Sequence, residues 1–304
     1  MKEVQNSLLN YIENKEGIEE NYENLIDIII EHQILQDKYE MKTFLYLLSQ
    51  ISKNHHRGPN FSDKIKQILS FFSNTIKKYF TSYEIFYIFR KSRNIILFFI
   101  QEKIIIMNKH IYNEITSPKS IRLRYHQYLL PELQKYMNKK SNSNFPSDFD
   151  EKRIIGENDH YICQLIRKDL IDEFTDYVNR NNYPLNSKIV ISIYETNSFL
   201  IKEKPTLIEY AMFFGAVKIF KFLYLKGIKL TSSMWFYAIH SNRLQFIDFL
   251  ESKRILPDDK SFESVFKESI KCHHNHLSIY IKNYLLEKKY KYHNSYRSRQ
   301  ARGE

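Results

Sequence analysis

Hydrophobic residues recur at helical spacing through most of the chain. Apolar positions repeat every three or four residues in stretches such as Met41–Ile51 and Lys64–Tyr79. Six glycines and seven prolines in 304 residues are too few for the many turns of an all-β protein. The pattern therefore predicts an all-α protein.

The clearest pattern lies between Pro205 and Leu230, where two short helices are expected. Thr206 stands where a side chain can cap the first helix. Gly215 follows that helix, at a point where the chain must reverse and a positive φ is tolerated. Gly227 ends the second helix at the position of a C-cap glycine. We therefore expect an antiparallel helix pair.

Similar segments lie on both sides of this pair. Met234–Leu250 repeats the pattern after 27 residues, with Ala238 in the place of Ala211 and Asn242 in the place of Gly215. Weaker copies run over residues 262–285 and 162–178. Such pairs are apolar on more than one side, so we expect them to stack on one another.

The stretch resembles the ankyrin repeat, which reads roughly T-P-L-H-x-A-A-x-x-G-H-x-E-I-V-x-x-L-L-x-x-G-A over about 33 residues. The matching residues are Thr206, Ile208, Ala211, Gly215, Ile219, Phe220, Phe222, Leu223 and Gly227. Departures from the pattern are Leu207, Glu209, Ala216 and Lys218, in place of the proline, the two histidines and the glutamate. The resemblance covers about 160–286. The phrases SIYETNSFLI, KPTLIEYA and KCHHNHLSIYI are similar to a divergent ankyrin-type family, a domain of unknown function, that is expanded in some protists.

The resemblance implies an ankyrin-type helix-pair solenoid that acts as a non-catalytic protein–protein interaction module, a scaffold or adaptor. In ankyrin proteins the partner meets the tips of the loops and the inner helix face. The positions here that correspond to loop tips are Lys202, Glu203, Lys204, Lys229, Thr231, Asp258, Asp259 and Lys260. Between the tips, Trp235 is expected in the core.

The N-terminal half is also expected to be helical. Tyr83–Lys103 reads as a helix pair without the glycine, which is compatible with degenerate ankyrin-like repeats or with an unrelated helical bundle. Polar residues Lys139–Asp150 read as a linker, and Lys188–Leu200 as a further helix. The expected organisation is a helical region over 1–150, an ankyrin-repeat region over 151–286 and a basic disordered tail over 287–304.

Charge raises a second possible function. Residues 51–140 carry 17 basic and 5 acidic side chains, while residues 141–287 carry 19 of each. Tyrosine and arginine interleave in Arg122–His126 and in Tyr290–Arg299, as contacts to bases and phosphates require. The alternative function is therefore a nucleic-acid-associated protein that uses the 51–140 segment and the tail.

No active site is evident in the sequence. Phosphate-binding glycine loops and nucleophile motifs are absent, and Cys163 reads as a core thiol. The run Cys272–His276 contains metal-ligating residue types, but it is contiguous and has no second ligand pair nearby. We therefore expect a polar turn there, with no catalytic residue, cofactor or metal.

The cysteine count and the apolar runs bear on where in the cell the chain is expected. Two cysteines do not make a disulfide framework. No secretory signal is evident, and no apolar run reaches the roughly 20 residues of a spanning helix. We expect no membrane insertion and a cytoplasmic location, with the nucleus as the alternative.

Overall fold

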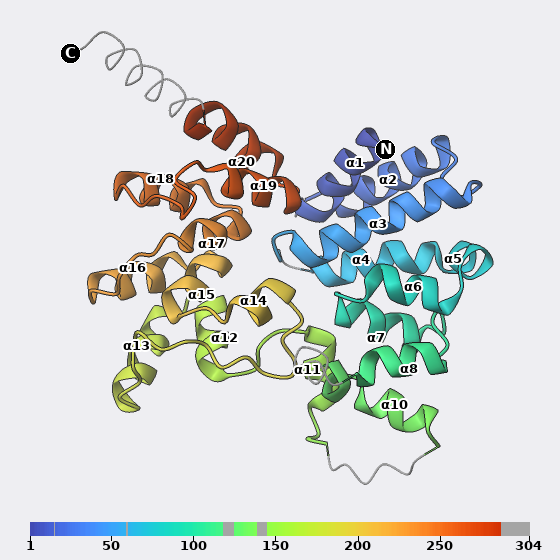
Figure 1. The fold of residues 1–304 in the computed structure, drawn as a ribbon, viewed down its shortest axis with the longest axis horizontal. Coiled ribbons are helices and arrows are strands. Elements are labelled where there is room, and N and C mark those ends of the chain that lie inside the picture. Colours follow the sequence, from blue (N-terminus) through green and yellow to red (C-terminus); the bar gives the residue numbers. More distant parts are fainter. Residues whose placement is uncertain (15, 59, 118–124, 139–144, 287–304) are drawn as a thin grey trace. The chain divides into compact units, whose positions relative to one another are not determined.

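The computed structural model describes all residues except 15, 59, 118–124, 139–144 and 287–304 (Figure 1). The described residues are all-α, as expected, and contain no strand. They divide into two compact units. The first comprises residues 1–53, 57–159 and 191–202, and the second comprises 54–56, 160–190 and the described residues from 203 onward. The domain boundaries and the disordered tail expected from the sequence stay predictions, and the tail lies outside the described residues.

Short helices build the first unit, and consecutive helices pack on each other. Contacting pairs include α1 with α2, α4 with α5, and α6 with α7. The bounds are α1 (Lys2–Glu13), α2 (Ile18–Glu31), α3 (Lys38–Asn54), α4 (Phe61–Phe71), α5 (Ser73–Tyr79), α6 (Ser82–Phe89), α7 (Arg93–Gln101), α8 (Lys109–Thr116), α10 (Leu130–Tyr136) and α11 (Phe149–Ile155). The expected pair over 83–103 is therefore present as α6 and α7.

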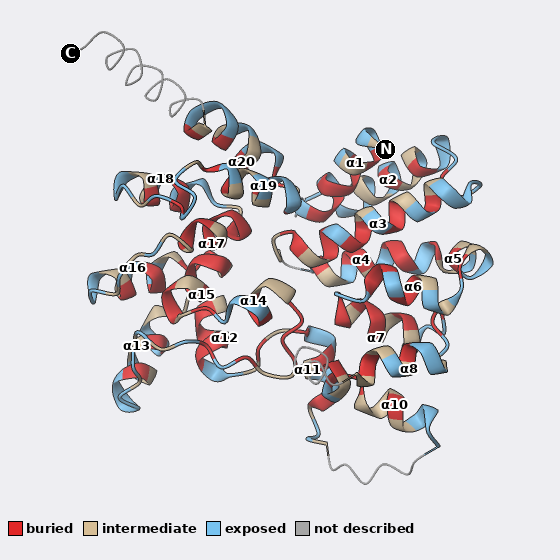
Figure 2. Cartoon of the chain, in the orientation of Figure 1, coloured by how far each residue is buried: buried red, intermediate tan, exposed pale blue. Residues whose placement is uncertain are grey.

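One apolar core runs through the first unit from Val4 to Leu133. Figure 2 shows buried residues along one side of most of these helices, as amphipathic helices require. Large aromatic side chains fill the core, and the Phe44 and Phe72 rings meet edge to face at 5.3 Å. Phe72 also separates α4 from α5, where a single helix was expected.

Four successive helix pairs make up the second unit. They are α12 (Tyr161–Arg167) with α13 (Ile171–Arg180), α15 (Leu207–Phe214) with α16 (Val217–Leu225), α17 (Met234–Ser241) with α18 (Leu244–Ser252), and α19 (Glu263–Lys271) with α20 (Asn275–Tyr280). A π-helical turn, Ile281–Leu286, continues α20. The first helices of the pairs stack in order, α12 on α15, α15 on α17 and α17 on α19 (Figure 1).

A left-handed residue joins the two helices of every pair in the second unit. These residues are Asp169, Gly215, Asn242 and His273, with φ between 51° and 73°. In three of the pairs the next residue donates a backbone hydrogen bond across the helix end: Leu170 to Leu165, Ala216 to Ala211 and His274 to Ser269, at 3.1, 2.8 and 3.1 Å. Each pair therefore reverses at a left-handed residue, although only one of these four residues is glycine.

Turn residues also connect neighbouring pairs. The Asp169 carboxylate accepts hydrogen bonds of 3.0 Å from the backbone N–H groups of Lys218 and Ile219, in the first turn of α16. A carboxylate at this position satisfies orphan helix N–H groups and complements the helix dipole. The turn of the first pair thus caps the second helix of the second pair.

The helix expected over Lys188–Leu200 is wrong for most of its length. Ile189 donates to the Pro205 carbonyl at 2.7 Å, and Lys188 forms an isolated antiparallel bridge with Thr206. Helix α14 begins only at Ser198 and ends at Glu203. Among the described helices, none is both long enough and apolar enough to cross a membrane.

Candidate functional site

Each of the eight predicted loop-tip residues is exposed. Lys202 and Glu203 lie in the last turn of α14 rather than in a loop, and Lys204 follows with a left-handed φ of 50°. The others lie in the loop between α16 and α17 and in the loop between α18 and α19. The structure thus places them where a partner can reach them, and their role in binding stays a prediction.

Hydrogen bonds link three successive loops of the second unit into one row. We call this set the loop row: residues 204–206 before α15, 228–233 before α17, and 255–262 before α19. Ser233 Oγ donates to Glu209 Oε1 at 2.7 Å, which ties the second loop to the first turn of α15. Ser232 Oγ donates to Asp258 Oδ1, which ties the second loop to the third. The loops therefore form a continuous, connected edge.

A capping box fixes the first loop of the row. Thr206 and Glu209 exchange hydrogen bonds, with the Glu209 carboxylate 2.8 Å from the Thr206 backbone nitrogen. The ankyrin pattern has histidine where this chain has Glu209, so glutamate holds the helix start here. Thr206 therefore has the capping role expected from the sequence.

Trp235 holds the loop between α18 and α19 in place. Its side chain is fully buried, as expected, and its indole N–H donates to the Ile255 carbonyl at 3.0 Å. Its ring meets Phe262 edge to face at 5.0 Å. The one tryptophan of the chain therefore holds both ends of the loop between α18 and α19.

One of the predicted tip residues, Asp259, makes hydrogen bonds within its own loop. Its carboxylate accepts backbone hydrogen bonds from Ser261, Phe262 and Ser264 at 3.0, 3.2 and 2.9 Å. Burial raises the pKa of Asp259, but the hydrogen bonds from Ser264 and Ser261 outweigh it and bring the pKa to about 2. The ionised carboxylate therefore stabilises the conformation of the loop between α18 and α19 through these hydrogen bonds.

The run Cys272–His276 contains the polar turn expected from the sequence, but two of its side chains are buried. Cys272 and His274 are fully buried, and His276 is exposed. Cys272 Sγ lies 3.6 Å from Nδ1 of His240, and His240 Nε2 lies 3.0 Å from Glu268 Oε1. A mixed cluster of thiol, imidazole and carboxylate therefore joins α17 to the end of α19.

Sequence reasoning missed His240 and Glu268 because neither adjoins the Cys272–His276 run. When the left-handed residues Asn242 and His273 are aligned, His240 and Glu268 both fall near the ends of stacked first helices. Comparing polar positions between consecutive repeats, rather than along the chain, would have brought the three residues together.

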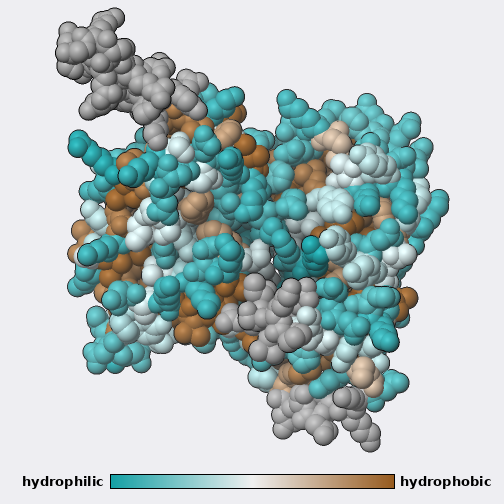
Figure 3. Space-filling view, viewed as in Figure 1, coloured by the Kyte–Doolittle hydropathy of each residue, from teal (hydrophilic) through white to brown (hydrophobic). Residues whose placement is uncertain are grey.

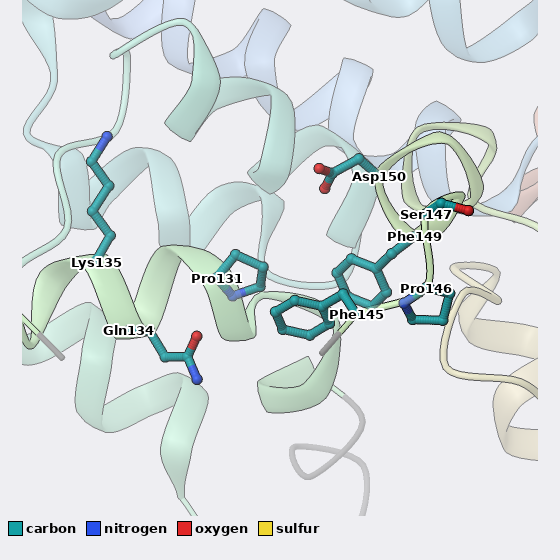
Figure 4. Close-up of a pocket in the computed structure, with 8 residues that line it drawn as sticks. All are labelled: Pro131, Gln134, Lys135, Phe145, Pro146, Ser147, Phe149 and Asp150. Atoms are coloured by element: carbon teal, nitrogen blue, oxygen red, sulfur yellow. The ribbon is translucent and has the colours of Figure 1, made fainter. Parts of the chain in front are cut away.

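A shallow pocket lies in the first unit, beside α10 and α11 (Figure 4). Its volume is about 320 Å³, and its lining residues are Pro131, Gln134, Lys135, Phe145, Pro146, Ser147, Phe149 and Asp150. The Phe145 and Phe149 rings stack at 4.3 Å, and Asp150 forms an ion pair with Arg153.

Several groups of the basic 51–140 segment are buried. Lys64 is 6% exposed and donates to the carbonyls of Tyr11, Ile12 and Asn14 at the end of α1. Burial lowers the pKa of Lys64. Arg93 is 3% exposed and lies 5.4 Å from the ring of Tyr125. These cations and this ring are not available to phosphates or bases.

No family model, curated protein or solved structure matches this chain.

Proposed function

We propose that this chain is a non-catalytic protein–protein interaction module, an ankyrin-type scaffold or adaptor that binds a protein along the loop row. The observation that carries the proposal is the connected edge itself. Four stacked helix pairs repeat one turn geometry, and hydrogen bonds hold three successive exposed loops side by side. A rigid scaffold with exposed polar loops is a common design for recognition.

The composition of the loop row suits a protein partner. Its tip residues mix Lys204, Lys229 and Lys260 with Asp258 and a hydroxyl, Thr231. Leu256 adds an apolar side chain that is 53% exposed. Mixed charge with a few apolar contacts is typical of protein interfaces, whereas a phosphate backbone selects a run of one sign.

The visible surface does not offer one dominant apolar site. Figure 3 shows a mostly hydrophilic face with separate apolar patches. Specificity would then come from the shape and polar groups of the loops rather than from a single hydrophobic groove.

Affinity isolation from lysate of the chain's own cells tests the proposal. The full chain is compared with Lys229→Glu/Lys260→Glu, in the loop row, and with Lys221→Glu/Lys267→Glu, on helices α16 and α19. All four lysines are exposed, and both variants change the net charge equally. We expect a protein partner that survives nuclease treatment and is lost only with the loop-row variant. Equal loss with both variants, or loss on nuclease treatment alone, would contradict the proposal.

A further inference from the structure

His240, Glu268 and Cys272 form a cluster outside the loop row. His240 lies on α17, Glu268 on α19, and Cys272 follows α19 directly. The side chain of His240 is 1% exposed and that of Glu268 14%, and Cys272 is fully buried. Their ligand atoms all lie within 4.8 Å of one another.

The distances within the cluster resemble the edges of a metal coordination tetrahedron. Zinc binds sulfur at about 2.3 Å, and nitrogen or oxygen at about 2.0 to 2.2 Å, so two of its ligands lie roughly 3.2 to 3.6 Å apart. Here His240 Nε2 lies 3.0 Å from Glu268 Oε1 and 3.8 Å from Cys272 Sγ. Small side-chain shifts would bring all three atoms into coordination range.

We propose that His240, Glu268 and Cys272 form a binding site for a transition-metal ion, and that zinc(II) is the ion it takes. A thiolate and an imidazole favour zinc and disfavour calcium and magnesium, which take oxygen ligands. The three residues supply three ligands and leave a fourth position for water or another group. The ion would tie the third helix pair to the fourth.

The surroundings of His240 and Glu268 set the charges of these two side chains. Burial lowers the pKa of His240, against the opposing effect of Glu268, so its imidazole is neutral near pH 7. Burial raises the pKa of Glu268, but the hydrogen bonds from His240 and Lys271 outweigh it and bring the pKa to about 2. For zinc to bind at Nε2, the thiol must lose its proton, and the His240 proton that faces Glu268 must move to Nδ1, where the Asn54 backbone can accept it. Metal binding supplies the drive for both changes.

His274 lies two residues after Cys272, but its ring nitrogens are grouped with His55 rather than with the cluster. His274 is fully buried, and neither ring nitrogen has a hydrogen-bond partner among the described residues. The centre of its ring lies 4.7 Å from that of His55, which belongs to the same unit, and the two rings are tilted by 50°. The proposed site therefore rests on His240, Glu268 and Cys272 alone.

Without an ion, the cluster is a hydrogen-bonded network. Lys271 Nζ lies 2.7 and 2.9 Å from the two Glu268 oxygens and competes for that carboxylate. The Lys271 side chain is 44% exposed, so it can turn toward solvent when an ion binds. If the cluster is only a hydrogen-bonded network, the chain binds no zinc there. If it is a metal site, the chain binds one zinc ion.

The test is zinc titration of the untagged full chain after metal removal, read by competition with a chromophoric chelator. We expect one zinc ion per chain. Cobalt(II) in its place should give a thiolate-to-metal charge-transfer band, because sulfur is a ligand. Cys272→Ser and Glu268→Gln should each weaken binding by at least about tenfold.

Two matched variants serve as controls. Cys163→Ser removes the other buried cysteine, and His276→Asn removes the exposed histidine of the contiguous run. Both should bind zinc as the unchanged chain does. Circular dichroism establishes folding, and where Cys272→Ser does not fold, Glu268→Gln and the cobalt spectrum decide. No zinc uptake, no thiolate band, or loss of zinc with His276→Asn would overturn the proposal.

Discussion

At Gly215 the backbone has a φ of +73°, and a Cβ there would lie 2.3 Å from Nε of Arg243. Gly227 has a φ of +84°, but a Cβ there would meet nothing within 4 Å. Gly215 therefore permits both a left-handed turn and the close approach of Arg243, from the α17–α18 pair. Gly227 serves only the turn.

Replacing Gly227 with alanine should lower the free energy of unfolding by about 1 to 2 kcal/mol, the cost of a Cβ in the left-handed region. Gly215→Ala should cost up to about 1 kcal/mol more, because the flexible end of the Arg243 side chain must move. Urea unfolding measures both. Adding Arg243→Ala to Gly215→Ala should remove the excess, and equal losses for the two glycines would contradict the stacking contact.

Buried histidines make stability depend on pH. Burial, and next the charge of His55, lower the pKa of His273 to about 4, and the pKa values of His240 and His274 are lowered as well. The unfolded chain therefore binds protons below about pH 6.5 that the folded chain does not bind. Stability should fall as the pH drops from 6.5 toward 4, by up to about 1.4 kcal/mol per pH unit for each group.

His273→Asn should reduce this pH dependence without disturbing the turn. His273 has a φ of 58°, which asparagine also adopts readily. Urea unfolding at pH 7.5, 6.5 and 5.5 compares the variant with the unchanged chain. The pKa of Glu268 is about 2, so its titration lies below this window. If the free energy of unfolding changed equally with pH in both proteins, a lowered pKa at His273 would be contradicted.

At the scale of an element, two capping boxes offer a matched comparison. Thr81 and Glu84 start α6 in the first unit as Thr206 and Glu209 start α15 in the second. Glu209 additionally accepts from Ser233, a link within the loop row. The two glutamates thus share a capping role and differ in the connection between loops.

Glu84→Ala and Glu209→Ala should each cost about 1 kcal/mol for the cap. Glu209→Ala should cost a further 0.5 to 1.5 kcal/mol or so, the net value of a lost hydrogen bond. Thermal or urea unfolding of both variants measures the difference. Two results would contradict a stabilising Ser233–Glu209 hydrogen bond. One is a Ser233→Ala variant with an unchanged free energy of unfolding, and the other is an equal loss of stability in the two glutamate variants.

The elements show where sequence patterns succeed and where they mislead. The helix pair after Pro205 is confirmed, because its apolar spacing and Gly215 agree. The helix over 188–200 is wrong because the local period is two: Ile189 and Ile191 are buried, while Val190 is 65% exposed. That alternation fits extended chain, which the bridge to Thr206 then holds.

At the scale of the whole molecule, the sequence predicts helices well and the joining of distant residues poorly. The exposure of the tip residues follows from local pattern. The links between Ser232 and Asp258, and between His240 and Glu268, join positions 26 and 28 residues apart in different pairs. Such contacts depend on how pairs stack, which no local period encodes.

The central claim is that the loop row is the surface that meets a protein partner. Site-specific photocrosslinking in cells tests it most directly, with a photoreactive phenylalanine analogue at Lys229 or Lys260 and, as control, at Lys221 in the middle of α16. We predict a discrete protein adduct from both loop positions and none from the control. An adduct from Lys221 of equal yield, or no adduct from either loop position, would contradict the account.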